Sequence, residues 1–264
     1  MNIHKLFDDM WSLYARINPQ VVKVKELIEK REGRPVKNDH IALRTFNHPR
    51  INRKVLAQSF LNSGYIEVED LKFEKKKLDA TYFTHNDDSL TRVFISELRL
   101  EEFSQELQDT INRLVDELPN KVIEQFDFCN YGTPWSMITE DTYNFLKEES
   151  EYAAWVATFG FIVNHFTISI NDCDTFENLE QVNSFLKENG YRVNDSGGEI
   201  KGSVEQGLEQ SSIMAENVLV EFDALEYKPV EIPGCYYEFA LRHNNFDGFI
   251  AGSADKIFES TDNK

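Results

Sequence analysis

The chain has 264 residues, and its content of 41% hydrophobic and 12% aromatic residues is sufficient for a packed globular core. Its 46 acidic residues outnumber 28 Lys and Arg, and a net charge of −18 argues against binding to nucleic acid or to an anionic membrane surface. No stretch has the apolar length of a membrane span, residues 1–17 lack the features of a secretory signal, and three cysteines form no disulfide framework, so we expect a cytoplasmic protein.

Residues 1–99 contain two patterns. Apolar residues at helical spacing predict two helices within residues 1–34, separated near Pro19. From residue 35 the pattern is that of a strand at 41–46, a helix at 53–62 and extended runs near 66–68, 80–84 and 92–98. Residues 35–99 are therefore predicted to form a β-α-β-β-β module.

The rest of the chain repeats this pattern after an insertion. Residues 100–160 are predicted as a helical insertion, with apolar periodicity over 101–118 and 143–159. Residues 161–245 begin with a strand, continue with a helix over 175–189 and then show extended runs near 191, 211–214, 218–222 and 236–241. Residues 246–264 form a C-terminal tail. A second β-α-β-β-β module is therefore expected, within a single domain of residues 1–264.

Matching residues support an internal duplication. His40 and His165 stand near the start of the first strand of each module and differ by 125 positions. Each histidine is followed by a Phe-Leu pair and then by a Gly-Tyr pair. The two Phe-Leu pairs also differ by 125 positions, and the two Gly-Tyr pairs differ by 126. Pseudo-symmetric modules can bring two such histidines together, so they could supply two ligands of one metal site.

Side chains alternate across a strand, so each histidine shares a face with small or polar residues. His40 shares its face with Arg44, and His165 shares its face with Thr167 and Ser169. The bulky apolar residues of both strands occupy the opposite faces. This pattern is typical of a strand whose polar face lines a cavity.

Glu238 is the only acidic residue within 232–246, and its neighbours are aromatic or aliphatic. Burying an unpaired carboxylate costs several kcal/mol, so Glu238 needs a cation. An ion pair with Arg242 or Arg44 would meet this need, with the histidines serving only as core residues. Two imidazoles and one carboxylate around a metal ion with open positions would meet it as well, and this ligand set suits iron(II) that binds a chelating substrate and O₂.

Three segments resemble a known enzyme family. Residues 39–46, 164–167 and 237–240 are similar to the 2-oxoadipate dioxygenase/decarboxylase family, also called 2-hydroxyglutarate synthase, within the vicinal oxygen chelate superfamily. The resemblance covers about residues 35–245. It implies an α+β fold with two paired β-α-β-β-β modules that form a curved mixed sheet around a metal cavity, with added N-terminal and central helices.

The resemblance also implies the site. The family's iron ligands fall on His40, His165 and Glu238, its catalytic-site arginine for substrate binding falls on Arg44, and Gln210 and Ser211 match a stretch that contacts substrate. The implied reaction takes a 2-oxo acid and O₂ and converts 2-oxoadipate into 2-hydroxyglutarate and CO₂. The chain lacks the larger additional domain of better-known members, and a different pocket wall would accept another 2-oxo acid.

Two alternatives remain open from the sequence. A glyoxalase-type metal-dependent isomerase or lyase would use a fourth protein ligand, for which Glu97 stands at the matching place in the first module. Such an enzyme would hold zinc or nickel and would consume no O₂. A non-catalytic module that binds a small acid would retain no metal.

Overall fold

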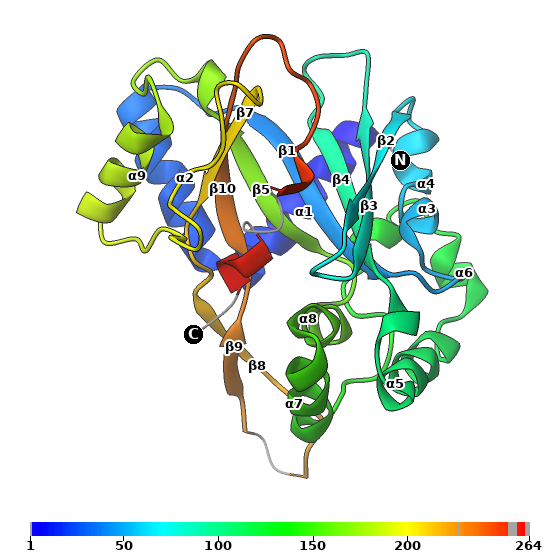
Figure 1. The fold of residues 1–264 in the computed structure, drawn as a ribbon. Coiled ribbons are helices and arrows are strands. Elements are labelled where there is room, and N and C mark those ends of the chain that lie inside the picture. The colour runs from blue at the N-terminus through cyan, green and yellow to red at the C-terminus, as the bar shows by residue number, and fades with distance from the viewer. Residues whose placement is uncertain (1, 226–227, 253–257, 262–264) are drawn as a thin grey trace. The chain divides into compact units, whose positions relative to one another are not determined.

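A computed structural model describes residues 2–225, 228–252 and 258–261 and shows a mixed α+β fold (Figure 1). Its α-helices are α1 (Ile3–Ile17), α2 (Pro19–Glu32), α3 (Arg53–Leu56), α4 (Gln58–Leu61), α5 (Gln105–Asp116), α6 (Asn120–Ile123), α7 (Glu140–Glu149), α8 (Glu151–Phe159) and α9 (Leu179–Glu188). Its strands are β1 (Asn38–Phe46), β2 (Ile66–Phe73), β3 (Leu78–Thr84), β4 (Arg92–Leu98), β5 (Val163–Ser169), β6 (Lys201–Ser203), β7 (Leu208–Ser212), β8 (Asn217–Val220), β9 (Val230–Pro233) and β10 (Tyr236–Arg242).

The backbone divides into two compact units. The first unit consists of Met1–Leu13, Ala42–Asn164 and Leu219–Ile232, and the second consists of Tyr14–Ile41, His165–Val218 and Pro233–Lys264. Strands β1 and β5 each pass from one unit into the other along the chain. The single domain expected from the sequence stays a prediction.

The first unit contains the predicted first module. Its strands have the order β2-β3-β4-β1, in which β3 runs antiparallel to both β2 and β4, and α3 contacts β4. The chain order β1-α3-α4-β2-β3-β4 confirms the β-α-β-β-β prediction. The single helix predicted over 53–62 is wrong in one respect, because it occurs as two short helices that meet at Ala57. There Phe60 N donates to Ala57 O at 3.0 Å, an i to i+3 bond that tightens the turn.

The second unit contains the predicted second module. Its strands have the order β1-β5-β10-β7-β6, in which β10 runs parallel to β5 and antiparallel to β7. Helices α2 and α9 pack against β10 (Figure 1). In both modules the last strand lies beside the first, β4 beside β1 and β10 beside β5. The duplication predicted from the histidine spacing is therefore confirmed in the strand order.

Three details of the second module differ from the prediction. Helix α9 begins at Leu179, because the Asn178 side chain caps it by accepting a hydrogen bond from Gln181 N. The run near residue 191 forms no strand of the sheet, and the second strand of the module is β6 instead. The run over 218–222 overlaps β8, which pairs with β9 in a separate two-stranded sheet. The three residues of β6 are Lys, Gly and Ser, so they lack the apolar alternation that predicts a strand.

The insertion is helical as predicted, but the helix predicted over 143–159 occurs as two helices, α7 and α8. Ser150 separates α7 from α8, and its side chain caps α8 by accepting a hydrogen bond from Ala153 N. None of the described helices combines the length and apolar character needed to cross a membrane. The cysteines are free thiols, of which Cys129 and Cys235 are buried.

Candidate metal centre

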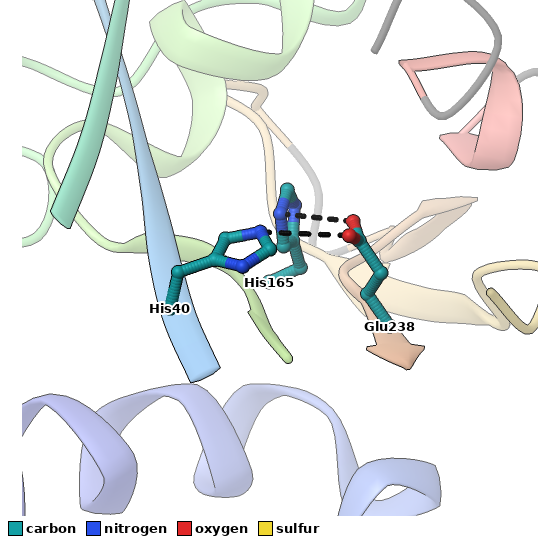
Figure 2. A group of neighbouring side chains, drawn as sticks. All are labelled: His40, His165 and Glu238. Atoms are coloured by element: carbon teal, nitrogen blue, oxygen red, sulfur yellow. Dashed lines mark ion pairs between the residues drawn. The ribbon is translucent and has the colours of Figure 1, made fainter. Parts of the chain in front are cut away.

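Three side chains of the second unit converge in Figure 2: His40 from β1, His165 from β5 and Glu238 from β10. Nε2 of His40 lies 3.5 Å from Oε1 of Glu238, and Nε2 of His165 lies 3.2 Å from Oε2. One ligand atom from each residue can be chosen so that all three lie within 4.8 Å of one another. The three residues selected from the sequence are therefore within reach of a single ion.

The pairing of neighbouring strands places these ligands. Tyr236 and His165 are partners in the parallel pairing of β10 with β5, and Glu238 and Thr167 are the partners two residues further along. Residues two apart on a strand share a face, so His165, Thr167, Tyr236 and Glu238 lie on one face of the sheet. The His165 ring stacks on the Tyr236 ring, with centroids 4.6 Å apart and planes at 29°.

His40 is oriented by a carboxylate. Its Nδ1 lies 2.7 Å from Oδ1 of Asp39, and its Nε2 lies 3.0 Å from Oγ1 of Thr167. Burial alone would raise the pKa of Asp39, but hydrogen bonds from His40 and Arg242 hold it well below its usual range. The ionised carboxylate only accepts hydrogen bonds, so Nδ1 carries a proton, and Nε2 is the ring nitrogen that faces Glu238.

Glu238 is completely buried, and this burial raises its pKa to about 7. The proximity of His40 and a hydrogen bond from Gln210 offset part of the effect. Oε2 of Glu238 receives no hydrogen bond from any residue that the structure describes. A buried carboxylate with an unsatisfied oxygen, facing two imidazole nitrogens, matches the donor set of a divalent transition metal. The residues therefore fit a metal ion.

The two predicted substrate residues of β7 differ in position. Gln210 is buried, and its Nε2 donates to Oε1 of Glu238 at 2.5 Å. Ser211 pairs with Phe239 of β10, so strand alternation directs its side chain to the opposite face from Glu238. The structure brings Gln210, but not Ser211, to the triad, and the substrate-binding role of Ser211 stays a prediction.

Arg44 belongs to the first unit, on the same strand as His40. Its side chain is buried, and its guanidinium carbon lies 5.1 Å from the ring centroids of both Tyr152 and Trp155. The ion pair considered between Glu238 and Arg242 is absent among the residues that the structure describes. Arg242 binds Asp39 instead, with Nε 2.7 Å from Oδ2.

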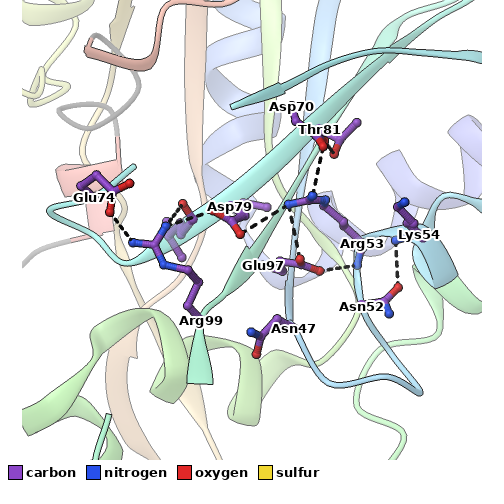
Figure 3. Close-up of polar contacts among 12 residues, drawn as sticks. Asn47, Asn52, Arg53, Lys54, Asp70, Glu74, Asp79, Thr81, Glu97 and Arg99 are labelled. Atoms are coloured by element: carbon purple, nitrogen blue, oxygen red, sulfur yellow. Dashed lines mark hydrogen bonds and ion pairs between the residues drawn. The ribbon is translucent and has the colours of Figure 1, made fainter. Parts of the chain in front are cut away.

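Glu97, the candidate fourth ligand of the isomerase alternative, lies in the first unit and pairs with Arg53 there. It accepts a hydrogen bond from Arg53 N at 2.9 Å and lies 3.3 Å from the Arg53 guanidinium (Figure 3). Burial raises its pKa, although Arg53 opposes the shift. Within the described ranges one group of three potential ligands occurs, and it contains His40, His165 and Glu238 without Glu97.

The sequence assigned no role at the site to Asp39 or Lys201, and it offered Arg242 only as a partner of Glu238. Asp39 directly precedes His40. An acidic residue next to a strand histidine was the sequence signal from which a carboxylate partner of that histidine could have been predicted. Arg242 lies 203 positions from Asp39, so no local pattern could predict their pairing. Lys201 of β6 is buried, its Nζ donates to Asn194 O at 2.5 Å, and burial lowers its pKa to about 8. Its strand was not predicted at all.

Comparison with known proteins identifies the family of this chain. Residues 5–244 match the family described as 2-oxoadipate dioxygenase/decarboxylase. The chain belongs to this family. It is 35% identical over 281 residues to the chloroplastic 2-oxoadipate dioxygenase/decarboxylase of Arabidopsis thaliana, in an alignment that covers 96% of this chain and 75% of the plant protein.

Solved structures agree with this membership. The hydroxyglutarate synthase of Oryza sativa, solved in complex with 2-oxoadipate, has a TM-score of 0.91 and 32% identity, covering 99% of this chain and 92% of the rice chain. A Shewanella frigidimarina protein, solved under the provisional name of a hydrolase, has a TM-score of 0.88 and 46% identity, covering 95% of this chain and 98% of that one. A Ralstonia eutropha protein provisionally assigned to the glyoxalase superfamily is 19% identical with a TM-score of 0.80, covering 94% of this chain and 85% of its own, and shares the fold.

Proposed function

We propose that this protein is an iron(II)-dependent dioxygenase that decarboxylates a 2-oxo acid, with 2-oxoadipate as substrate. The observation that carries the proposal is the buried triad of His40, His165 and Glu238 in a chain of the 2-oxoadipate dioxygenase/decarboxylase family. The reaction is 2-oxoadipate plus O₂ to 2-hydroxyglutarate plus CO₂, and both oxygen atoms of O₂ enter the products. No external reductant is needed, because the 2-oxo acid supplies the electrons.

Iron(II) bound by this triad would supply the redox chemistry and the positions at which a 2-oxo acid chelates and O₂ binds. The protein's own residues have other tasks. Asp39 keeps the proton of His40 on Nδ1, so that Nε2 is available as a ligand. Gln210 holds Oε1 of Glu238 by a hydrogen bond, which leaves Oε2 directed at His165. Burial of all three ligands keeps bulk water away.

Arg44 is proposed to bind the carboxylate of the substrate that is remote from the metal. It lies four residues after His40 on β1, which corresponds to about 13 Å along a strand. Two aromatic rings flank its buried guanidinium, and a buried guanidinium binds a carboxylate by two parallel hydrogen bonds. Gln210 is proposed to contact substrate as well, because its Oε1 accepts no hydrogen bond from the described part of the chain.

The test is anaerobic loading with iron(II), followed by mixing with oxygenated buffer and a panel of 2-oxo acids. We expect 2-oxoadipate to cause equal losses of O₂ and gains of CO₂, with 2-hydroxyglutarate as the product by mass spectrometry. A protein that binds zinc or nickel and turns over substrate without O₂ would instead be a glyoxalase-type enzyme. A folded protein that retains no metal would contradict the proposal.

Arg44→Met tests the substrate assignment. We expect kcat/KM for 2-oxoadipate to fall about 100-fold, because a charge-assisted bidentate contact is lost, while iron content stays at the wild-type level. Turnover of 2-oxohexanoate, which lacks the second carboxylate, should change little. Arg31→Met is the matched control, since the Arg31 guanidinium also lies over two rings, those of Phe176 and Phe185. Equal losses with both substrates would exclude Arg44 from carboxylate binding.

A further inference from the structure

A buried chain of contacts lies behind His40, on the side away from Glu238. Oδ1 of Asp39 lies 2.7 Å from Nδ1 of His40, and Arg242 donates to both oxygens of the same carboxylate, from Nε at 2.7 Å and from Nη2 at 3.0 Å. The side chains of Asp39 and Arg242 are only 3% and 9% exposed. Asp39 is therefore held from two sides and cannot rotate away from the imidazole.

Residues 243–249 hold Arg242 in turn. Nη1 of Arg242 donates to Gly248 O at 2.8 Å and approaches Phe246 O at 3.4 Å, and its guanidinium carbon lies 5.3 Å from the Phe249 ring. The Phe249 ring then meets the His40 ring edge to face, with centroids 4.8 Å apart at 88°. These contacts form a closed ring of neighbouring side chains that runs from His40 through Asp39, Arg242 and Phe249 back to His40.

We propose that Asp39 and Arg242 are positioning residues that set the tautomer and orientation of His40 for metal binding. This inference depends on the proposed metal site. A neutral imidazole has one N–H, and a carboxylate at Nδ1 keeps that hydrogen on Nδ1. Nε2 then presents its lone pair toward His165 and Glu238. Carboxylates that hydrogen-bond to ligating histidines typically contribute 10-fold to 100-fold to metal affinity.

The role of Arg242 makes a specific prediction for Asp39→Asn. Arg242 can only donate and contacts both oxygens of Asp39, so the NH₂ of the introduced amide faces an N–H of Arg242 in either orientation. Where the NH₂ also faces Nδ1 of His40, Nδ1 must become the acceptor. The hydrogen then moves to Nε2, the atom that should bind the metal. In the double variant Asp39→Asn with Arg242→Met, the amide is free to turn its oxygen back to His40.

Two measurements test this on the full chain, with cobalt(II) as the probe. Titration followed by visible absorption gives the cobalt(II) affinity, and ¹⁵N NMR of labelled histidine in the metal-free protein gives the tautomer of His40. Asp174→Asn is the matched control, because it removes the same charge from an Asp–Arg pair of the second unit that is exposed, with Arg34 at 2.9 Å. Circular dichroism establishes that each variant is folded.

We expect Asp39→Asn to weaken cobalt(II) binding 10-fold to 100-fold and to populate the tautomer of His40 with its hydrogen on Nε2, while the double variant regains most of the affinity and Asp174→Asn matches the wild type. If Asp39→Asn fails to fold, Arg242→Met alone should keep the Nδ1–H tautomer and still weaken binding measurably. Wild-type affinity and tautomer in Asp39→Asn, or a double variant as weak as the single one, would overturn the positioning role. A wild-type chain that binds neither cobalt(II) nor iron(II) would overturn the metal site itself.

Discussion

Glu238 determines the charge of the candidate metal site, since it is the completely buried carboxylate between two imidazole nitrogens. An ion of charge +2 would satisfy the free oxygen of this carboxylate and offset the cost of burying it. Without the ion the same carboxylate destabilises the fold. One residue therefore links metal affinity with stability, in opposite directions for the metal-free and metal-bound protein.

Glu238→Gln is expected to weaken cobalt(II) binding more than about 100-fold, because the anionic ligand is lost. The free energy of unfolding of the metal-free variant should be about 1 kcal/mol higher than that of the metal-free wild type, because a neutral amide costs less to bury than a carboxylate. Titration and urea unfolding measure the two effects. Glu209→Gln is the control, since Glu209 also pairs with a histidine, His243 at 2.8 Å, but belongs to no ligand group among the described residues. A metal-free Glu238→Gln variant less stable than the wild type would contradict this account.

The three residues of the candidate metal site could be predicted from the sequence, whereas the residues that contact His40 from behind could not. His40 and His165 carry a signal that is visible in one dimension, because the duplication repeats their surroundings at a fixed offset. Glu238 is conspicuous as a lone acid in an apolar strand. The Asp39–Arg242 pair has no such signal, because Arg242 was equally able to reach Glu238 on the same strand. Only the pairing of strands distant in sequence decides between these partners.

The segment of residues 243–249 follows β10 in the second unit and departs from regular backbone geometry near the site. Asn244 and Asn245 adopt left-handed conformations with φ of 54° and 56°, which lets the chain turn directly after β10. Gly207 supports this turn: its carbonyl accepts a hydrogen bond from His243 N at 2.9 Å. A side chain at position 207 would meet Cβ of Phe246 at 2.6 Å.

Gly207→Ala is therefore expected to lower the free energy of unfolding by about 2–3 kcal/mol, through a φ of 85° and the clash with Phe246. Gly190→Ala separates the two causes, because Gly190 has a φ of 87° but no atom within 4 Å of the place that an added methyl group would take. It should cost about 1–2 kcal/mol from the backbone alone. Urea unfolding measures both. Equal losses of unfolding free energy in the two variants would show that residues 243–249 shift to accommodate the added methyl group at little cost.

Helices and strands could be predicted where an apolar periodicity extends over many residues. The prediction was poor where a capping side chain sets the start of a helix or where pairing with a neighbour makes a segment a strand. The long apolar patterns of α1, α2 and α5 appear as expected, and so do the strands that carry the histidines. Helix α9 starts later than its apolar pattern suggested, because the Asn178 side chain accepts a hydrogen bond from the backbone N–H of Gln181 in the first turn. Strand β6 has three residues, and its identity as a strand comes from pairing with β7 rather than from its own side chains.

The whole molecule carries a net charge of −18, spread over the sequence, and this charge has its own effect on stability. Like charges repel more strongly in the compact chain than in the unfolded one, and added salt screens the repulsion. Divalent cations will also associate weakly with many surface carboxylates. A rise in melting temperature on adding metal is therefore insufficient evidence for a specific site.

The final prediction separates the two effects by comparing the wild type with Glu238→Gln. Sodium chloride and magnesium chloride should raise the melting temperature of both proteins equally, because the screened charges lie outside the triad. Iron(II) under anaerobic conditions should stabilise only the wild type, by about 4 kcal/mol or roughly 10 °C at a thousand times its Kd, because it binds the folded state alone. Magnesium prefers six oxygen ligands, so two imidazoles disfavour it. If iron(II) stabilised both proteins by the same amount, its binding would be that of a counterion, and the triad would hold no metal.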